Sequence, residues 1–416
     1  MKRKTPLIFS ALCAVAAAAF FSPAYFSNLS LAPAAVSFTR EEQANEPPPP
    51  PKVEHVATPE AVKAIYMSQC AAGSDDFRKN LFALADETEV NSIVVDLKDY
   101  SGTVAFPSET AEKGGNGCTV SDFENLVKSM HKHGIYVIGR MTVFQDPLYT
   151  KAHPELAVQR KSGGIWKDNK GLSFVDVGAR PFWDYIITLA KEAHHLGVDE
   201  INFDYIRYPS DGPMSETLYM HSSTTGSHQE NVERFFAYLN QQMKVEQDEH
   251  MPVLSADLFG MAATNYDDLN IGQVLERTMP YFDFIAPMVY PSHYPPNFHG
   301  YPNPNKEVYG VVNFSMREAA RRAVATTSVI AWFGGEPVPT TTPQLYTKKV
   351  YPKTVMRPWL QDFDYGGEYG PTEVRDQIQA AYDAGLNSWM LWAPSNRYTK
   401  AALELASTTD AGDLTR

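Results

Sequence analysis

Residues 199–212 read DEINFDYIRYPSDG, a run of strand-forming residues that carries a carboxylate, Asp204, between two aromatic residues. Aromatic and β-branched residues favour strands that pack against a core. An unpaired charge in such surroundings would be costly to bury. Asp204 is therefore expected either to pair with Arg140 or Arg207, or to reach a site that opens where the strand ends.

Seven more runs with a similar β-rich composition recur along the chain. Together with 199–208 they make eight, and the others span 61–68, 91–100, 135–144, 251–260, 282–291, 354–363 and 387–394. Apolar residues at helical spacing fill the gaps between the runs, for example over 123–130. Several predicted helices end at a glycine before the next run, as at Gly134, Gly197 and Gly385, which is typical of a left-handed helix cap.

This alternation predicts the fold class. Strands that are apolar on both faces and alternate with helices indicate a parallel sheet covered by helices. Eight such strands are the number that closes a (β/α)₈ TIM barrel, whose active site lies at the C-terminal ends of the strands. We expect an α/β fold of this kind, built as a single domain. An open doubly wound sheet is the alternative, but no G-x-G-x-x-G motif follows the first strand.

The segments outside the barrel predict export. Residues 1–24 have a basic start, an apolar run and then Ser-Pro-Ala, which is the plan of a secretory signal peptide or, alternatively, of an N-terminal membrane anchor. Residues 25–60 contain five consecutive prolines and are expected to be a disordered linker. The barrel is expected over 61–406 and a flexible tail over 407–416. The protein is thus predicted to be periplasmic, bound to the cell envelope or secreted.

Composition narrows the range of partners. Of the 416 residues 44% are hydrophobic and 20% are charged, as in ordinary soluble proteins, and the formal net charge is −13. Nucleic acids and anionic membrane surfaces both attract a basic face, so neither is expected to be the main partner. A membrane tether through residues 1–24 is the one membrane contact that this composition leaves as an alternative. We expect a monomer that requires no cofactor.

Cys70 and Cys118 are the two cysteines beyond the signal segment. In an exported chain they can form one disulfide that closes a loop of about 50 residues, and such a bond stabilises a fold by a few kcal/mol. Two free thiols are the equal alternative. No histidine cluster lies near them in the sequence, and His194 and His195 are adjacent on a predicted helix, so no metal site is expected.

Polar and aromatic side chains gather near the C-terminal ends of the runs. Side chains two apart share a strand face, so Asp96 and Lys98 are expected to point together, and so are Asn202, Asp204 and Ile206. The other candidates from the strand ends and the loops after them are Arg140, Arg207, Asp257, Tyr290, His293, Trp359, Gln361, Asp362, Trp392 and Asn396. Branched apolar residues usually fill a barrel interior, so this clustering predicts a functional site.

Paired carboxyl groups are what the cleavage of a glycosidic bond requires, one to donate a proton and the other to attack or to activate water. Asp204 and Asp257 come from consecutive predicted strands, and nearby cations would separate their pKa values. Aromatic rings would cover sugar faces, and polar side chains would bind hydroxyl groups. Structural explanations compete with this one: Asp96 or Asp257 can pair with Lys98, and Asp362 can bind loop amides.

Five motifs, INFDYIRYPSDG, VLSADLFGMA, IAPMVYPSHY, RPWLQDFDY and WMLWAPSN, occur in this order within residues 60–400. With them the chain resembles a bacterial family of glycoside hydrolase-type (β/α)₈ barrels that is distantly α-amylase-like. In α-amylase-like enzymes the nucleophilic aspartate stands at the end of strand four, and the resemblance puts Asp204 there. Those enzymes carry an arginine and a glutamate where this chain has Asn202 and Asp257. Asp362 is the alternative acid.

The expectation is an exported glycoside hydrolase that cleaves the O-glycosyl bonds of a polysaccharide, which would be an envelope glycan, an exopolysaccharide or an α-glucan. Asp204 is expected to act as nucleophile or base and Asp257 as acid, and the other candidate residues are expected to bind the substrate. Two alternatives come from different classes of protein. One is a non-catalytic carbohydrate-binding barrel, and the other is a membrane-tethered envelope scaffold.

Overall fold

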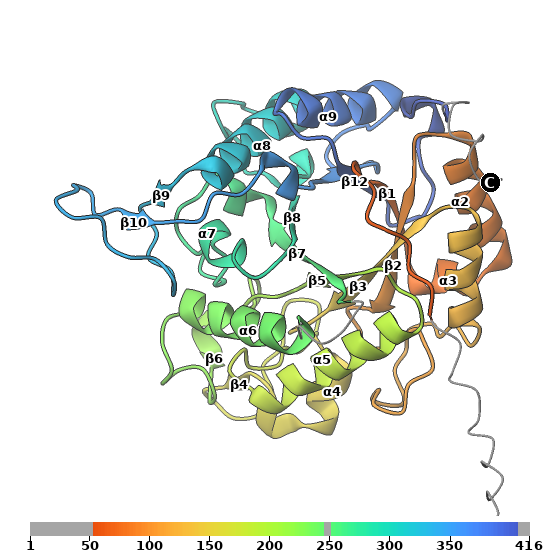
Figure 1. Cartoon of the computed structure of the whole chain (residues 1–416). Coiled ribbons are helices and arrows are strands. Elements are labelled where there is room, and N and C mark those ends of the chain that lie inside the picture. The colour runs from red at the N-terminus through yellow and green to blue at the C-terminus, as the bar shows by residue number, and fades with distance from the viewer. Residues whose placement is uncertain (1–52, 245–250, 407–416) are drawn as a thin grey trace, which may run out of the picture. The chain divides into compact units, whose positions relative to one another are not determined.

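The computed structural model describes residues 53–244 and 251–406, and its centre is a closed barrel of eight parallel strands (Figure 1). These strands are β1 (Lys63–Met67), β2 (Ser92–Lys98), β3 (Tyr136–Thr142), β5 (Glu200–Asp204), β7 (Val253–Phe259), β8 (Phe284–Met288), β11 (Trp359–Gln361) and β12 (Trp389–Trp392). β1 pairs with both β2 and β12, which closes the ring. Each predicted run contains one barrel strand, and the (β/α)₈ prediction is confirmed.

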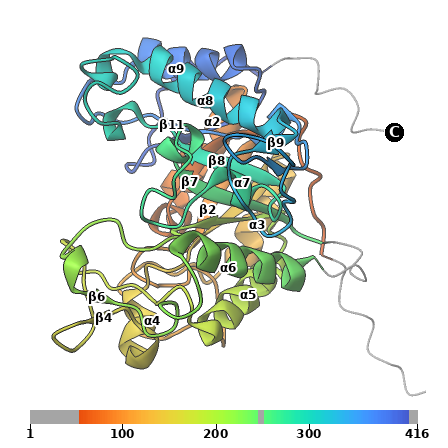
Figure 2. The ribbon, with the colours of Figure 1, turned by 90° about the vertical axis from the view of Figure 1, so that its left-hand side faces the viewer.

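Helices surround the barrel (Figures 1 and 2). They are α1 (Gln69–Ala72), α2 (Asp75–Glu87), α3 (Phe123–Lys132), α4 (Pro147–Ala152), α5 (Arg180–His195), α6 (His228–Met243), α7 (Leu275–Thr278), α8 (Val308–Val324) and α9 (Pro371–Asp383). The apolar stripe predicted over 123–130 is buried on α3. Gly134, Gly197 and Gly385 follow α3, α5 and α9 with φ angles of 69°, 100° and 88°. These are the predicted left-handed caps, a conformation that glycine adopts without steric cost.

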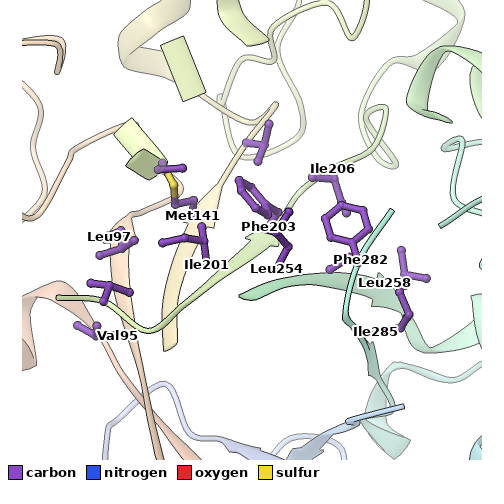
Figure 3. Packing of buried hydrophobic residues seen from close by; sticks show 14 of the residues in the cluster. Val95, Leu97, Met141, Ile201, Phe203, Ile206, Leu254, Leu258, Phe282 and Ile285 are labelled. Atoms are coloured by element: carbon purple, nitrogen blue, oxygen red, sulfur yellow. The ribbon is translucent and has the colours of Figure 1, made fainter. Parts of the chain in front are cut away.

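Two apolar layers stabilise the barrel because side chains alternate along each strand. On β1, Ile65 and Met67 belong to the outer layer between strands and helices, whereas Ala64 and Tyr66 belong to the inner layer. Figure 3 shows part of the outer layer, which includes Leu97, Met141, Ile201, Phe203 and Leu254. Burial on both faces explains why the strands read as nearly continuous apolar runs.

The barrel interior also holds a buried ion pair. Arg357 Nη1 lies 2.8 Å from Oε1 and 2.9 Å from Oε2 of Glu200, and the Tyr136 hydroxyl donates to Oε2 at 3.1 Å. Glu200 begins β5, so this pair lies toward the N-terminal side of the barrel, below the strand end that carries Asp204. The interior is therefore more polar than the branched apolar filling that is usual in such barrels.

Two antiparallel strand pairs lie outside the barrel. β4 (Gln159–Arg160) pairs with β6 (Thr217–Leu218), and this pairing joins the long segments that follow β3 and β5. β9 (Thr327–Ser328) pairs with β10 (Tyr346–Thr347) in the connection from α8 to β11. The β9–β10 segment stands out from the ring of helices in Figure 1. Only the first pair belongs to loops at the C-terminal ends of the strands, where the site is predicted.

The edges of the folded part depart a little from the prediction. The Val56 N–H donates to Asp199 Oδ1 at 2.7 Å, so the folded part begins before residue 61. Cys70 and Cys118 form a disulfide, which joins α1 to the segment between β2 and α3. The predicted signal segment 1–24, most of the predicted linker and the tail 407–416 lie outside the described residues. Within the described ranges no helix is long and apolar enough to cross a membrane.

Candidate active site

Arg140, on β3, lies among three carboxylates at the C-terminal end of the barrel. Its Nη1 donates to Asp96 Oδ1 on β2 at 2.7 Å, its Nη2 donates to Asp204 Oδ2 on β5, and its Nε lies 3.8 Å from Asp257 Oδ2 on β7. These four strands are consecutive around the barrel, and all four side chains are buried. In the described ranges no group of three or more metal-ligating side chains is placed to hold a metal ion. The Arg140 guanidinium lies within ion-pair distance of all three carboxylates.

The backbone turns sharply directly after Asp204. Tyr205 has a φ of 51°, a left-handed conformation that residues other than glycine rarely adopt. Its N–H donates to Asp204 Oδ1 at 2.6 Å, so both carboxylate oxygens of Asp204 accept hydrogen bonds. The turn ends the alternation of side chains, and Ile206 lies in the outer apolar layer. The prediction that Ile206 shares a face with Asp204 is wrong for this reason.

The two carboxylate oxygens of Asp257 have different surroundings. Oδ1 accepts hydrogen bonds from Asn202 Nδ2 at 2.9 Å and from Trp359 Nε1 at 2.8 Å. Oδ2 has no hydrogen-bond partner among the residues that the structure describes. Burial, reinforced by the charge of Asp204, raises the pKa of the Asp257 carboxyl well above its usual range. The neutral form of Asp257 is therefore favoured to higher pH than in an exposed carboxyl group, and Oδ2 is the oxygen free to carry the proton.

A cavity of about 340 Å³ opens above this cluster. Asp204, Asp257 and Arg140 form a polar part of its lining, and the remainder is mostly aromatic and apolar. Five other predicted site residues line it as well, namely Arg207, Tyr290, His293, Trp359 and Trp392. The sequence analysis expected Asp204 either to pair with an arginine or to reach a site at the end of its strand. Both are found, because Asp204 pairs with Arg140 and also lines the cavity.

Two further cavities adjoin the first at Tyr205. One of about 760 Å³ shares Arg140, Tyr205 and Trp392 with it and extends past Asp96 to α1 and to residues 114–117. The other, of about 450 Å³, shares Tyr205 and Arg207 with it. Tyr205 is thus a side chain that lines all three cavities.

Lys98 does not join this cluster, and the prediction that it points with Asp96 is wrong. The register of β2 against β3 shifts between Asp96 and Lys98, and such an irregularity breaks the alternation of side chains. Lys98 Nζ lies 2.8 Å from Asp146 Oδ2 and donates to the carbonyl oxygen of Thr142 at 2.7 Å. The competing pairing of Lys98 with Asp96 or Asp257 is not formed either, and Arg140 contacts both of those acids instead.

Gln361 and Asp362, at the end of β11, are engaged with neighbouring loops rather than with the cavities. The Oε1 of Gln361 accepts a hydrogen bond from the Ser292 hydroxyl at 2.8 Å. The carboxylate of Asp362 accepts one from the Thr399 N–H at 2.9 Å and one from the Thr399 hydroxyl at 2.6 Å. These contacts fit the competing explanation in which Asp362 binds loop amides.

The two asparagines predicted to bind substrate, Asn202 and Asn396, form hydrogen bonds within the protein instead. Asn202 is fully buried beneath Asp257 and donates to it and to the Ser255 hydroxyl, so it orients the acid rather than contacting the cavity. The Oδ1 of Asn396 accepts hydrogen bonds from the N–H and the hydroxyl of Ser68, at 3.1 and 2.7 Å. Asn396 thereby ties the loop after β12 to the loop after β1.

Tyr66, near the end of β1, is a site residue that the sequence analysis did not identify. Its hydroxyl donates to Asp96 Oδ2 at 2.5 Å, and its ring stacks on Trp392 with 4.0 Å between ring centroids. A tyrosine within an apolar run resembles any core residue. The available signal was its place at the C-terminal end of the first predicted strand, which is where a barrel site is built.

Comparison with known proteins identifies relatives of the barrel. Residues 64–398 match a family described as "Putative glycosyl hydrolase domain". A hypothetical protein from Ruminiclostridium thermocellum is 32% identical, with a match that covers 50% of this chain and 98% of that one at a TM-score of 0.41. No curated protein matches the chain.

Two further solved structures are more distant in sequence. The PgaB (BpsB) glycoside hydrolase domain from Bordetella bronchiseptica is 11% identical, with 83% of this chain and 100% of that chain covered and a TM-score of 0.55. The alpha-L-fucosidase isoenzyme 2 from Paenibacillus thiaminolyticus is 14% identical, with 82% and 47% covered and a TM-score of 0.53. At this level of identity the likeness shows a shared barrel fold.

Proposed function

The chain belongs to the glycosyl hydrolase-type family that its residues 64–398 match, and on this premise we propose that it hydrolyses glycosidic bonds within a polysaccharide. Asp204 is the nucleophile or general base, and Asp257 is the general acid. The proposal rests above all on one observation: two buried carboxyl groups on neighbouring strands contact the same guanidinium at the floor of a cavity. Paired carboxyl groups are the catalytic requirement of this reaction.

The surroundings of the two acids favour this division of roles. Both oxygens of Asp204 accept hydrogen bonds, one of them from the Arg140 guanidinium, and these bonds hold the carboxylate in a fixed orientation at the floor of the cavity. Asp257 is in an environment that raises its pKa, and a carboxyl group that holds its proton to higher pH is suited to protonate a leaving oxygen.

The shape and lining of the cavities support a polymeric substrate. Trp392 and Tyr290 line the cavity that contains both acids, and aromatic rings of this kind can cover the apolar faces of sugars. Two adjoining cavities share Tyr205 with this cavity and would offer room for further sugar units. Residues 1–24 predict export, so the substrate that we propose is an envelope glycan, an exopolysaccharide or an α-glucan.

The test is a panel of bacterial glycans incubated with the full chain and scored for new reducing ends. We expect wild type to release them and Asp204→Asn to be slower by about 10²-fold or more, because a charged catalytic group is lost while its shape is kept. Asp376→Asn, on the outer helix α9, is the matched control and should keep wild-type activity. Equal rates for wild type and Asp204→Asn would remove the role assigned to Asp204.

A carbohydrate-binding barrel without catalysis is the second candidate, and one observation favours it. Asp204 is only 4% exposed and is held by Arg140, an arrangement that also serves as a purely structural pair. In that case no glycan would be cleaved, and wild type and Asp204→Asn would bind oligosaccharides alike. Calorimetric titration of the same panel distinguishes this candidate from the hydrolase.

A further inference from the structure

Arg207 is buried but, unlike the other buried arginines of the described residues, it forms no ion pair. Arg140, Arg277, Arg322 and Arg357 are buried too, and each lies in contact with a carboxylate. Arg207 is 7% exposed, yet no carboxylate oxygen of the described residues lies within ion-pair distance of it. Within the described part of the chain its one hydrogen bond runs from Nη1 to the carbonyl oxygen of Tyr208, at 2.9 Å.

Aromatic rings hold this guanidinium in place. Its central carbon lies 4.6 Å from the ring centroid of Phe259, 4.8 Å from that of Tyr205 and 5.9 Å from that of Phe174. Stacking on rings leaves the edge of the planar guanidinium, with its N–H donors, available for hydrogen bonds. The side chain is therefore fixed in position without its charge being paired.

Arg207 also lies where a ligand of the barrel would pass. It lines both the 340 Å³ cavity above Asp204 and Asp257 and the adjoining 450 Å³ cavity, which Lys170 lines as well. The nearest acids are already engaged: Asp204 binds Arg140, and Asp168 Oδ1 accepts the N–H groups of Lys170 and Leu172. Asp211, the other acid of the smaller cavity, lies beyond ion-pair distance of Arg207.

A buried charge without a partner destabilises a fold, so folds rarely keep one unless a ligand pairs with it. We propose that Arg207 binds an oxyanion on the glycan, either the carboxylate of a uronic acid or a sulfate ester, on a sugar unit next to the bond above Asp204 and Asp257. This inference rests on the proposed function for the identity of the polymer. It adds that the polymer is acidic.

Arginine suits this role because its fork of N–H donors matches the two oxygens of a carboxylate or a sulfate. A neutral sugar would use the same donors for hydroxyl groups, but it would leave the charge unpaired. The charge of the sugar is therefore the property that the subsite distinguishes, and a matched pair of charged and neutral oligosaccharides can measure it.

The experiment is calorimetric titration of the full chain, in the Asp204→Asn background so that binding is measured apart from turnover. The probes are an oligouronate, the same oligomer with its carboxyl groups reduced to alcohols, and a sulfated neutral oligosaccharide. We expect at least one oxyanion probe to bind about tenfold or more tighter than the reduced oligomer, with a difference that shrinks as salt rises. The probe that shows the preference identifies the oxyanion.

Adding Arg207→Gln should abolish the preference, and Arg207→Lys should keep part of it, because a lysine retains the charge and loses the fork. Arg317→Gln, on the exposed face of α8, is the matched control and should change nothing. Arg207→Gln should also fold at least as stably as its parent, since it removes an unpaired charge.

Equal binding of charged and neutral oligomers, binding of none, or a preference that survives Arg207→Gln would each overturn the inference. A neutral glycan cleaved as fast as an acidic one would overturn it while the hydrolase function stands.

Discussion

The indole N–H of Trp359 donates a 2.8 Å hydrogen bond to Oδ1 of Asp257, although the two residues are 102 positions apart in the chain. β11 and β7 bring them together on either side of β8. With Asn202 bound to the same oxygen, this contact leaves Oδ2 as the atom that can hold a proton, in a carboxyl group that lines the cavity. The orientation of the proposed acid on β7 is thus set by side chains from two other strands, β5 and β11.

Asp257→Asn should slow the cleavage of natural glycans by about 10²- to 10⁴-fold, because the leaving oxygen then receives no proton. The loss should be much smaller for an aryl glycoside of the same sugar, whose phenolate leaves without protonation. In wild type the rate should fall as pH rises through the raised pKa of Asp257, and the variant should lack this alkaline decline. Rate profiles against pH for both substrates check this, and an equal loss on both would contradict the acid role.

Asp257→Asn should lower the catalytic rate but raise the stability of the fold. Asp257 has a folded-state pKa above its unfolded value, so its contribution to stability is complete below the unfolded pKa and is lost as pH rises through the folded pKa. The amide that replaces the carboxyl group stays neutral, so Asp257→Asn should gain stability over wild type as pH rises from about 4 to about 8. Urea unfolding across this range measures the difference, and a gap that does not widen with pH would argue against a buried, protonated Asp257.

Arg140→Met should destabilise the barrel by about 3–5 kcal/mol near neutral pH, because buried acids lose their shared cation. Burial already raises the pKa of Asp96 and Arg140 opposes that rise, so without Arg140 this carboxyl group should take up a proton more readily. The cost should therefore shrink toward about pH 4. Chemical unfolding at the two pH values tests this. A loss that is the same at both would mean that packing, not charge, is what Arg140 provides.

Cys118→Ser should lower the free energy of unfolding by up to about 4 kcal/mol, the value of the chain-entropy model for a loop of this length. The bond to Cys70 spans 48 positions and encloses the residues at 114–117 that line the largest of the three cavities. Urea unfolding with and without a reductant checks the value. Wild type should lose the same amount when reduced, whereas the variant should not respond to the reductant.

Patterns that repeat locally allowed most of the fold to be predicted. The alternation of β-rich runs with helical stripes, and the glycines at 134, 197 and 385, depend on neighbours within a few residues, so the sequence reports them directly. The site was predicted only in part. Lys98 was misplaced because a register shift depends on the partner strand, and Ile206 because Tyr205 adopts a left-handed turn.

What the sequence by itself determined is the barrel and the strand ends on which acids and aromatic residues would stand, because side-chain periodicity and strand count are properties of the chain alone. Which acids meet was decided by the tertiary structure. Only the closed ring brings Asp96, Asp204 and Asp257 to one guanidinium and leaves Arg207 without a carboxylate among the described residues. Charges act through space, so their pairing depends on distances that strand closure creates and that spacing along the chain does not contain.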